Sequence, residues 1–177
     1  MKIYLLRHCA AAGQELAAPL TPQGEEQAER LADFLADKGI DAIATSPYLR
    51  ARASIAPFAR RRGLAVRIDQ RLAERVLSVQ SLPDWQEALR RTFEDADLSF
   101  PGGETSRAAT ARGLDALHKL EESGCATAAA VTHGNLMALL LRSFDPEFGY
   151  AEWRALRNPD CYVIETGEGA PKVWHAW

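Results

Sequence analysis

Two histidines, two arginines and a glutamate of this sequence each come shortly after a short apolar segment. Arg7 and His8 follow the N-terminal apolar segment, and His133 follows a run of small residues. Arg50 and Glu74 come a few residues after two further apolar segments. The strands of a parallel sheet end at the same edge, and ligands bind beyond that edge in open sheets. If the apolar segments are such strands, these five side chains converge in one crevice.

These residue types together are suited to phosphoryl transfer. Guanidinium groups bind phosphate oxygens bidentately. The free N–H groups of a helix N-terminus also bind phosphate, and Gly134 and Asn135 would open such a helix. Positive charges nearby disfavour protonation of a histidine, so His8 would keep one ring nitrogen free as a nucleophile at neutral pH. Glu74 could protonate a departing alkoxide and then activate water. The carboxylates are scattered and no histidine pair has metal-ligand spacing, so we predict a reaction through a phosphohistidine that uses no metal and no cofactor.

Each of these residues also has an interpretation without catalysis. A single histidine at a strand end is more often a surface or capping residue, and Arg52, close to Arg50, fits a solvated helix face. Glu74 stands between Ala73 and Arg75 and could simply be exposed. The prediction of a site therefore depends on all of these residues lying at one edge of the sheet.

The patterns between these residues predict alternating strands and helices. Apolar segments predict strands at residues 2–6, 42–45, 66–68, 128–132, 161–165 and 172–174. Apolar residues at helical spacing, with capping residues and terminal glycines, predict helices from Thr21-Pro22 to Gly39 and at about 49–62, 84–92, 105–122 and 135–144. We therefore predict an α/β fold, a three-layer αβα sandwich whose mostly parallel central sheet has helices on both faces.

The composition is that of one globular domain. The chain has 177 residues and a formal net charge of −3, with 47% hydrophobic and 25% charged residues. This length predicts a single domain over residues 1–177. The acidic balance argues against nucleic-acid binding, and no apolar run approaches the ~20 residues of a membrane span. The apolar N-terminal run is too short for a signal peptide, so we expect a cytoplasmic protein.

Seven segments carry the chemistry-bearing residues and the turns around them. They are Leu6-Arg7-His8-Cys9, Leu20-Thr21-Pro22-Gln23-Gly24, Ser46-Pro47-Tyr48-Leu49-Arg50-Ala51, Leu72-Ala73-Glu74, Pro101-Gly102-Gly103-Glu104-Thr105 with Arg112, His133-Gly134-Asn135 and Asn158-Pro159-Asp160-Cys161. In this order they resemble the motifs of the histidine phosphatase superfamily, in the branch that includes cofactor-dependent phosphoglycerate mutases. Each motif alone is weak, but the set extends from residue 3 to about 165 and is specific.

The resemblance implies a role for each candidate residue. His8 would be the phosphorylated nucleophile, and Glu74 would be the proton donor. Arg7, Arg50 and His133 would bind the transferred phosphoryl group. The remaining substrate-binding positions implied by the resemblance are Gln14, where the family often has a phosphate-binding Asn, together with Thr21, Gly134 and Asn135. The expected partner is a phosphorylated small molecule.

The chain departs from the family pattern at two positions, because Cys9 replaces a Gly and Ala10 replaces a frequent Glu. A thiol beside a reactive histidine suggests thiol chemistry, but we favour a small buried residue beneath the loop. With Cys125 and Cys161 the cysteines are odd in number and lack Cys-x-x-Cys spacing. This pattern predicts neither a disulfide framework nor a zinc ribbon.

The interval from Glu74 to Pro101 is only 27 residues, and the corresponding region of the mutases is much longer. A mutase must exclude water from its phosphohistidine, whereas a short cap segment at about 75–100 leaves hydrolysis as the expected outcome. We therefore predict a phosphatase. The alternatives are a phosphoglycerate mutase, a protein-phosphohistidine phosphatase and a catalytically inactive phosphate-binding regulatory module. The aromatic residues expected either to line the substrate pocket or to pack in the core are Trp85, Phe93, Phe148, Tyr150 and Trp153.

Overall fold

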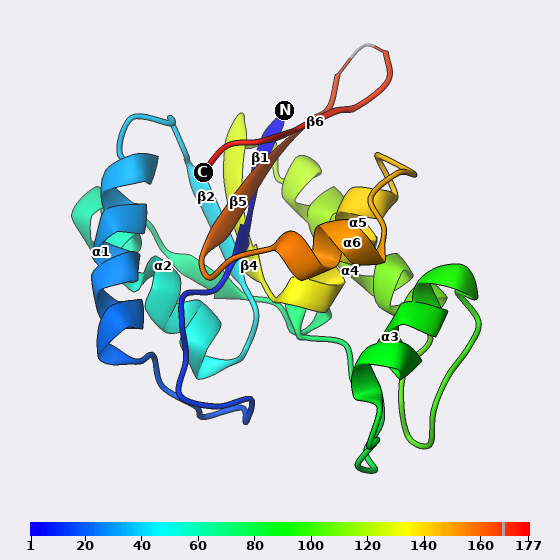
Figure 1. Cartoon of the computed structure of the whole chain (residues 1–177). Coiled ribbons are helices and arrows are strands. Elements are labelled where there is room, and N and C mark those ends of the chain that lie inside the picture. The colour runs from blue at the N-terminus through cyan, green and yellow to red at the C-terminus, as the bar shows by residue number, and fades with distance from the viewer. Residues whose placement is uncertain (168) are drawn as a thin grey trace.

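The computed structural model of the chain describes residues 1–167 and 169–177, and in these residues it has one six-stranded sheet (Figure 1). The strands lie in the order β3-β2-β4-β1-β5-β6. Neighbours among the first four strands are parallel, while β5 is antiparallel to both β1 and β6. The predicted mostly parallel sheet is therefore confirmed. The strands are β1 (Lys2–Arg7), β2 (Ala42–Thr45), β3 (Val66–Ile68), β4 (Thr127–Thr132), β5 (Asp160–Glu165) and β6 (Lys172–His175).

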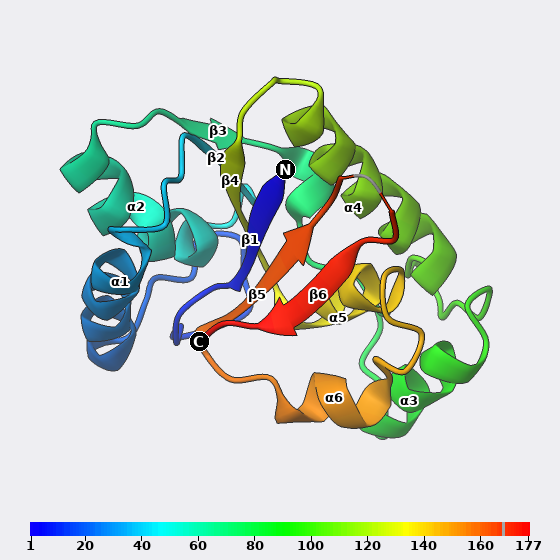
Figure 2. The ribbon, with the colours of Figure 1, turned by 90° about the horizontal axis from the view of Figure 1, so that it is seen from above.

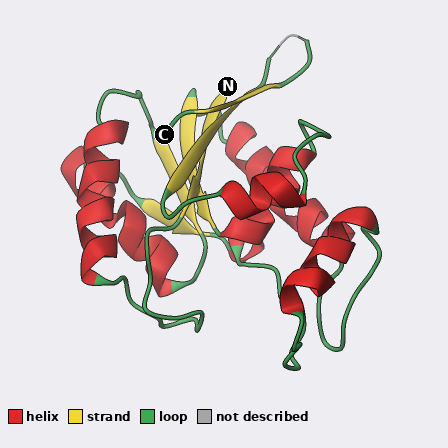
Figure 3. Cartoon of the chain, viewed as in Figure 1, coloured by secondary structure: helices red, strands yellow, loops and turns green. Residues whose placement is uncertain are grey.

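Helices cover both faces of this sheet, as predicted for a three-layer αβα sandwich. Helices α1 and α2 lie on one face, and α4 and α5 lie on the other with α3 and α6 beside them (Figures 1, 2 and 3). No helix of residues 1–167 and 169–177 is both long and apolar enough to cross a membrane. The helices are α1 (Pro22–Leu35), α2 (Leu49–Arg62), α3 (Trp85–Glu94), α4 (Ser106–Glu121), α5 (Gly134–Arg142) and α6 (Tyr150–Ala155).

Alternating strand side chains form two apolar cores, one on each face. In β1, Leu5 packs with α4 and α5 whereas its neighbour Leu6 packs with α1 and α2. Strand β4 does the same with alanines, since Ala130 joins the first core and Ala129 the second. Successive residues of a strand point to opposite faces, so a strand that is covered on both sides must be apolar throughout. This explains why the segment that becomes β4 has no polar residue between Thr127 and Thr132.

The elements begin and end for local reasons. The hydroxyl of Thr21 accepts a hydrogen bond from the Gly24 amide at 3.0 Å, which caps α1 ahead of Pro22. This helix ends at Leu35, four residues before the predicted stop at Gly39. Helix α6 was not predicted because it has no buried residue and so carries no apolar periodicity in the sequence.

The register of the sheet places three strand ends together. Arg7, the last residue of β1, is opposite Thr132, the last residue of β4. Thr45, the last residue of β2, is opposite Val131. The residues that follow β1, β2 and β4 therefore emerge at one edge of the sheet, as the sequence analysis requires.

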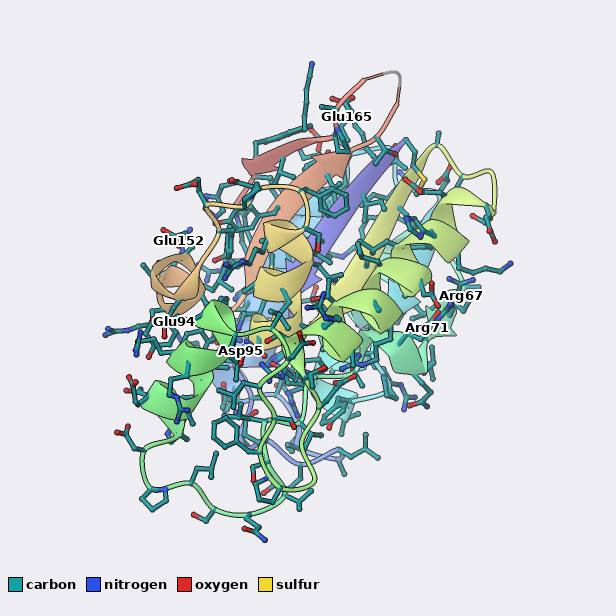
Figure 4. The ribbon with its side chains drawn as sticks, turned by 90° about the vertical axis from the view of Figure 1, so that its right-hand side faces the viewer. Arg67, Arg71, Glu94, Asp95, Glu152 and Glu165 are labelled. Carbon is teal, nitrogen blue, oxygen red and sulfur yellow. The ribbon has the colours of Figure 1, made fainter. Side chains whose placement is uncertain are left out.

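The segment after β3 is held against the same edge. Asp69 binds two arginines, Arg71 with an Nη2–Oδ2 distance of 2.7 Å and Arg67 with a distance of 3.7 Å, and these arginines lie close together in Figure 4. A 3-10 turn, η1 (Gln70–Leu72), follows. The hydroxyl of Thr132 then donates a hydrogen bond of 2.8 Å to the carbonyl of Leu72. These contacts bring Glu74 to the carboxyl end of β4.

Candidate active site

His8 follows β1 and is buried, with 7% of its surface exposed. Its Nδ1 lies 2.7 Å from the carbonyl oxygen of Cys9, and a carbonyl can only accept, so Nδ1 carries the proton. Nε2 of the neutral ring then has a free lone pair, which accepts a hydrogen bond from Nε of Arg50 at 3.1 Å. Burial lowers the pKa of His8 to about 4, and the positive charges of Arg50 and Arg7 contribute. His8 is therefore neutral at pH 7, with an unprotonated Nε2 that is held by the hydrogen bond from Arg50.

His133 follows β4 and immediately precedes α5, and only 1% of its surface is exposed. Its Nδ1 accepts a hydrogen bond from Nη2 of Arg50 at 3.2 Å, so Nε2 carries the proton and donates to the hydroxyl of Ser46 at 2.7 Å. The rings of His133 and His8 are 5.0 Å apart. The pKa of His133 lies well below its ordinary value because of burial first, and then because of His8 and Arg50. The ring is therefore a neutral hydrogen-bonding group beside the nucleophile.

Arg50 connects the two histidines to the loop that follows β1. It is the second residue of α2, and 1% of its surface is exposed. Its Nη1 donates to the carbonyl oxygens of Gln14 and Glu15 at 3.0 Å each, and its guanidinium lies 4.5 Å from the ring centre of Tyr48. Burial lowers the pKa of Arg50, but an arginine remains charged. The positively charged guanidinium of Arg50, with each of its three nitrogens in a hydrogen bond, therefore lies beside Nε2 of His8.

Arg7 and the start of α5 lie against one another. Nη1 of Arg7 donates to the carbonyl of Leu156 at 2.8 Å, and its buried Nε has no hydrogen-bond partner among the described residues. A Cβ at Gly134 would lie 3.1 Å from Cζ and Nε of Arg7, so a side chain at this position would require the guanidinium to shift by a few tenths of an ångström. Asn158 donates from Nδ2 to the carbonyl of His8 at 2.7 Å and so holds the segment that contains Leu156 against the end of β1.

Glu74 forms an N-terminal cap on α5, which the sequence analysis did not foresee. Its carboxylate accepts hydrogen bonds from the amides of Asn135 at 3.1 Å, Leu136 at 2.9 Å and Arg75 at 2.9 Å. A negative group is favoured at a helix N-terminus, where amides point outward without partners in the helix. The carboxylate therefore lies at the helix end that could also bind a phosphate.

A cavity of about 380 Å³ opens beside these groups. Five of the predicted site residues line it: Arg7, Gln14, Glu74, Gly134 and Asn135. The other three buried ones, His8, Arg50 and His133, are joined by the hydrogen bonds described above. The structure thus brings together every predicted site residue except Thr21. The Thr21 side chain instead caps α1 and lies 3.4 Å from the carbonyl of Ala10.

The remaining predictions near the site can be compared in the same way. Cys9 is fully buried, and burial raises the pKa of its thiol to about 11, which agrees with a small inert residue rather than a reactive thiol. Arg52 is exposed, as expected for a solvated helix face. Among the aromatic residues, Trp85 and Trp153 line the cavity, while Phe93 and Phe148 are buried in the core and Tyr150 packs against it.

Two residues of the site were missed as candidates. Ser46 directly follows β2 and binds Nε2 of His133 through its hydroxyl, a contact between residues 87 positions apart in the sequence. Arg75 is buried and donates from Nη1 to the hydroxyls of Thr92 and Ser106, and from Nε to the carbonyl of Glu104. These contacts are between distant segments, so no local pattern could reveal them. Within the described part of the chain, no three or more His, Cys, Asp and Glu side chains are grouped so that they could hold a metal ion.

Comparison with known proteins gives one family match and several similar structures. The family model described as "Histidine phosphatase superfamily (branch 1)" matches residues 3–175. No curated protein matches the chain. A mycobacterial glucosyl-3-phosphoglycerate phosphatase superposes with a TM-score of 0.78 at 25% identity, over 98% of this chain and 96% of that one.

Two further solved structures share the fold at lower identity. A putative alpha-ribazole-5′-P phosphatase from Escherichia coli has a TM-score of 0.76 at 20% identity, over 99% of this chain and 95% of its own. A mutant phosphoserine phosphatase from Entamoeba histolytica, in complex with phosphoserine, has a TM-score of 0.79 at 18% identity, over 99% and 96%.

Proposed function

The chain belongs to the histidine phosphatase superfamily, branch 1, and on that premise we propose that it hydrolyses phosphomonoesters of small metabolites through a phosphohistidine on His8, without a metal. The observation that carries this proposal is the tautomer of His8. Its Nδ1 donates its proton to the Cys9 carbonyl, so Nε2 is the nitrogen with the free lone pair. That lone pair faces Arg50. The nucleophilic atom is therefore unprotonated at neutral pH without any further base.

In the first step, Nε2 of His8 attacks phosphorus and the bond from phosphorus to the ester oxygen breaks. The phosphoryl group is then bonded to Nε2, while Nδ1 keeps its proton and its hydrogen bond to the Cys9 carbonyl. Before this step the Glu74 carboxylate takes up a proton from solvent. It then gives this proton to the departing oxygen, which leaves as the alcohol. Arg7, Arg50 and His133 stabilise the phosphoryl oxygens in the transition state.

In the second step, water attacks phosphorus and the bond from phosphorus to Nε2 breaks. Glu74, now ionised, takes a proton from the attacking water and is ready for the next turnover. Inorganic phosphate leaves, and His8 regains its Nε2 lone pair. The hydrogen bonds that the carboxylate accepts from the first amides of α5 support this role, because they hold it at the start of the helix, next to Gly134 and Arg7.

Two further facts support a small phosphorylated metabolite as the substrate. The cavity of about 380 Å³ has the size of a small-molecule site, and arginine, amide and carboxylate groups line it. The similar structures named above carry the names of phosphatases for glucosyl-3-phosphoglycerate, alpha-ribazole phosphate and phosphoserine.

The test is phosphate release by the purified protein from p-nitrophenyl phosphate and from a panel of phosphorylated metabolites, with EDTA present. We expect turnover, and a protein phosphate that is labile to acid and stable to alkali after a brief reaction. His8→Ala should lose at least about 10³-fold in kcat, since the covalent route is removed. The matched control is His118→Ala on the exposed surface of α4, which should keep full activity.

The same assay separates the alternatives. With 3-phosphoglycerate and 2,3-bisphosphoglycerate, a mutase would form 2-phosphoglycerate hundreds of times faster than it releases phosphate. A protein-phosphohistidine phosphatase would act on a phosphohistidine peptide and not on the esters. An inactive module would bind phosphate without turnover of any of these compounds. Any of these three results would refute the proposal.

A further inference from the structure

Two kinds of residue line the cavity beside Glu74. The polar ones come from the strand ends and the start of α5, and they account for the phosphoryl group. The apolar ones come from α3, α6 and the segment after Glu74, and the proposed mechanism uses none of them. We call these four residues the apolar wall: Leu77, Trp85, Leu89 and Trp153.

Packing in the core does not cover the whole surface of either tryptophan of the apolar wall. Trp85 is the first residue of α3, and 48% of its surface is exposed. Trp153 lies in α6, where it is partly buried against the core and keeps part of its surface at the cavity. The two rings are 6.2 Å apart with their planes at 90°. A tryptophan that remains half exposed at a cavity leaves a large apolar surface in water, and a ligand that covers this surface gains hydrophobic free energy.

Aromatic contacts hold this wall in place from the core outward. Trp153 stacks on Tyr150 with a centroid distance of 5.3 Å and an interplanar angle of 28°. Tyr150 in turn packs edge to face on Phe93 at 6.1 Å, and Phe93 is buried in the core. The ring of Trp153 is therefore fixed before any ligand binds, which reduces the entropy that binding must overcome.

The wall offers few partners to a hydroxylated ligand. Arg75 lines the cavity beside the apolar wall, but its Nε and Nη1 already bind Glu104, Thr92 and Ser106. Its Nη2 has no partner among the described residues and is buried away from the surface. Sugar hydroxyls placed against the leucine side chains and the faces of the indole rings would lose water there and find few hydrogen-bond partners beyond the two indole N–H groups, which is costly. A flat apolar group would meet no such cost.

We infer that the alcohol part of the substrate carries a flat, apolar ring, aromatic or heteroaromatic, that packs against Trp85 and Trp153. The inference rests on the proposed function, because it assigns the ester's leaving group to the apolar wall. Trp85 and Trp153 are then specificity-determining residues, and they act on the binding of the alcohol part rather than on the chemical step.

The test compares two esters of primary alcohols, 2-phenylethyl phosphate and ethyl phosphate, with glucose 6-phosphate as a hydroxylated ester. We expect kcat/KM for 2-phenylethyl phosphate to exceed that for ethyl phosphate by about tenfold or more, mainly through KM. This ratio should fall to about threefold or less in Trp85→Ala and in Trp153→Ala, and Trp85→Phe should retain most of it. Trp174→Ala is the matched control, because Trp174 is similarly exposed, at 40%, but lies in β6 and does not line the cavity.

An unchanged ratio in Trp85→Ala would refute the inference, as would a preference for glucose 6-phosphate over 2-phenylethyl phosphate. Because the ratio is measured within one protein, partial misfolding of a variant does not alter it. Calorimetry with His8→Ala provides a measurement without turnover, and 2-phenylethyl phosphate should bind about tenfold more tightly than ethyl phosphate. If the native protein released phosphate from no ester but this difference in binding remained, the proposed function would be wrong and the apolar wall would be supported.

Discussion

Nε of Arg50 donates a hydrogen bond of 3.1 Å to Nε2 of His8, the atom that attacks phosphorus in the mechanism we propose. The same guanidinium donates to His133 through Nη2, so one arginine occupies a ring nitrogen of each histidine. A phosphoryl group can reach Nε2 only after the first of these bonds is broken. In the proposed mechanism Arg50 must therefore exchange the ring nitrogens for phosphate oxygens when the substrate binds. Its positive charge then lies beside the negatively charged phosphoryl group.

Arg50→Lys should consequently reduce kcat/KM much more than a charge-conserving substitution usually does. A lysine ammonium is a point charge and cannot replace a planar fork that binds two histidines and two carbonyls. We expect kcat/KM to fall by about 10²–10³-fold, measured with p-nitrophenyl phosphate. The exposed neighbour Arg52 on the same helix provides the control, and Arg52→Lys should stay within about twofold. Equal effects of the two substitutions would contradict a phosphate-binding role for Arg50.

The stability of the protein should depend on pH through His8. Its pKa is about 4 in the folded protein against 6.5 for the free side chain, so between these values the unfolded chain binds more protons. The free energy of unfolding should therefore fall as the pH is lowered from about 6.5 to 4. The loss from this residue is at most about 3 kcal/mol. Urea unfolding at pH 7.5 and 4.5 measures it.

His8→Gln should reduce this pH dependence, because the titrating ring is then absent. His118→Gln, on the surface of α4, should leave it as in the native protein. If the native protein and His8→Gln lost the same free energy between the two pH values, His8 would not be held neutral by the fold.

Glu74→Gln should separate substrates by the leaving group. Glutamine keeps the size of the side chain but cannot transfer a proton, so alkyl phosphates should react about 10²–10⁴-fold more slowly. Nitrophenolate leaves without protonation, so the burst of p-nitrophenyl phosphate in a single turnover should be much less affected. Equal losses in the burst for both esters would show that Glu74 only positions the substrate or shapes the site.

Gly134→Ala should impair phosphate binding through Arg7. The new Cβ would lie 3.1 Å from Cζ and Nε of the arginine, so the guanidinium must shift by a few tenths of an ångström or more. We expect KM to rise by about tenfold and the free energy of unfolding to fall by about 1–2 kcal/mol. Gly149→Ala is the control, because the nearest atom to its Cβ is a flexible carboxylate oxygen at 3.4 Å. A variant at Gly134 with native KM would contradict the tight contact.

Cys9→Ala should keep nearly full activity, since the thiol is buried and its pKa is raised to about 11. The loss of a buried sulfur should lower the free energy of unfolding by only about 1 kcal/mol. Steady-state kinetics and urea unfolding measure the two effects. Loss of turnover with native stability would instead indicate thiol chemistry beside His8.

The sequence was sufficient for features that depend on local pattern or on parallel strand order. The alternation of apolar segments and helical periods predicted the three layers, and the strand ends predicted the meeting of Arg7, His8 and His133. It was not sufficient for contacts that depend on folded distances, such as the cap that Glu74 forms on α5 or the buried hydrogen bonds of Arg75. For Thr21 the local pattern correctly predicted the N-terminal cap of α1. The expected substrate contact of its side chain came only from the family resemblance, and in the structure the side chain binds the helix.

The hydrogen bond of 2.8 Å from the Thr132 hydroxyl to the Leu72 carbonyl has a consequence for how such a protein can diversify. Thr132 is adjacent in sequence to His133, and Leu72 comes two residues before Glu74. The distance between His133 and Glu74 is thus set at the end of β4, before the loop that leads to Trp85 begins. Under the proposed function, insertions, deletions and substitutions in that loop can change which alcohols fit while these two side chains keep their separation. Substrate range and reaction chemistry can therefore vary independently along this chain.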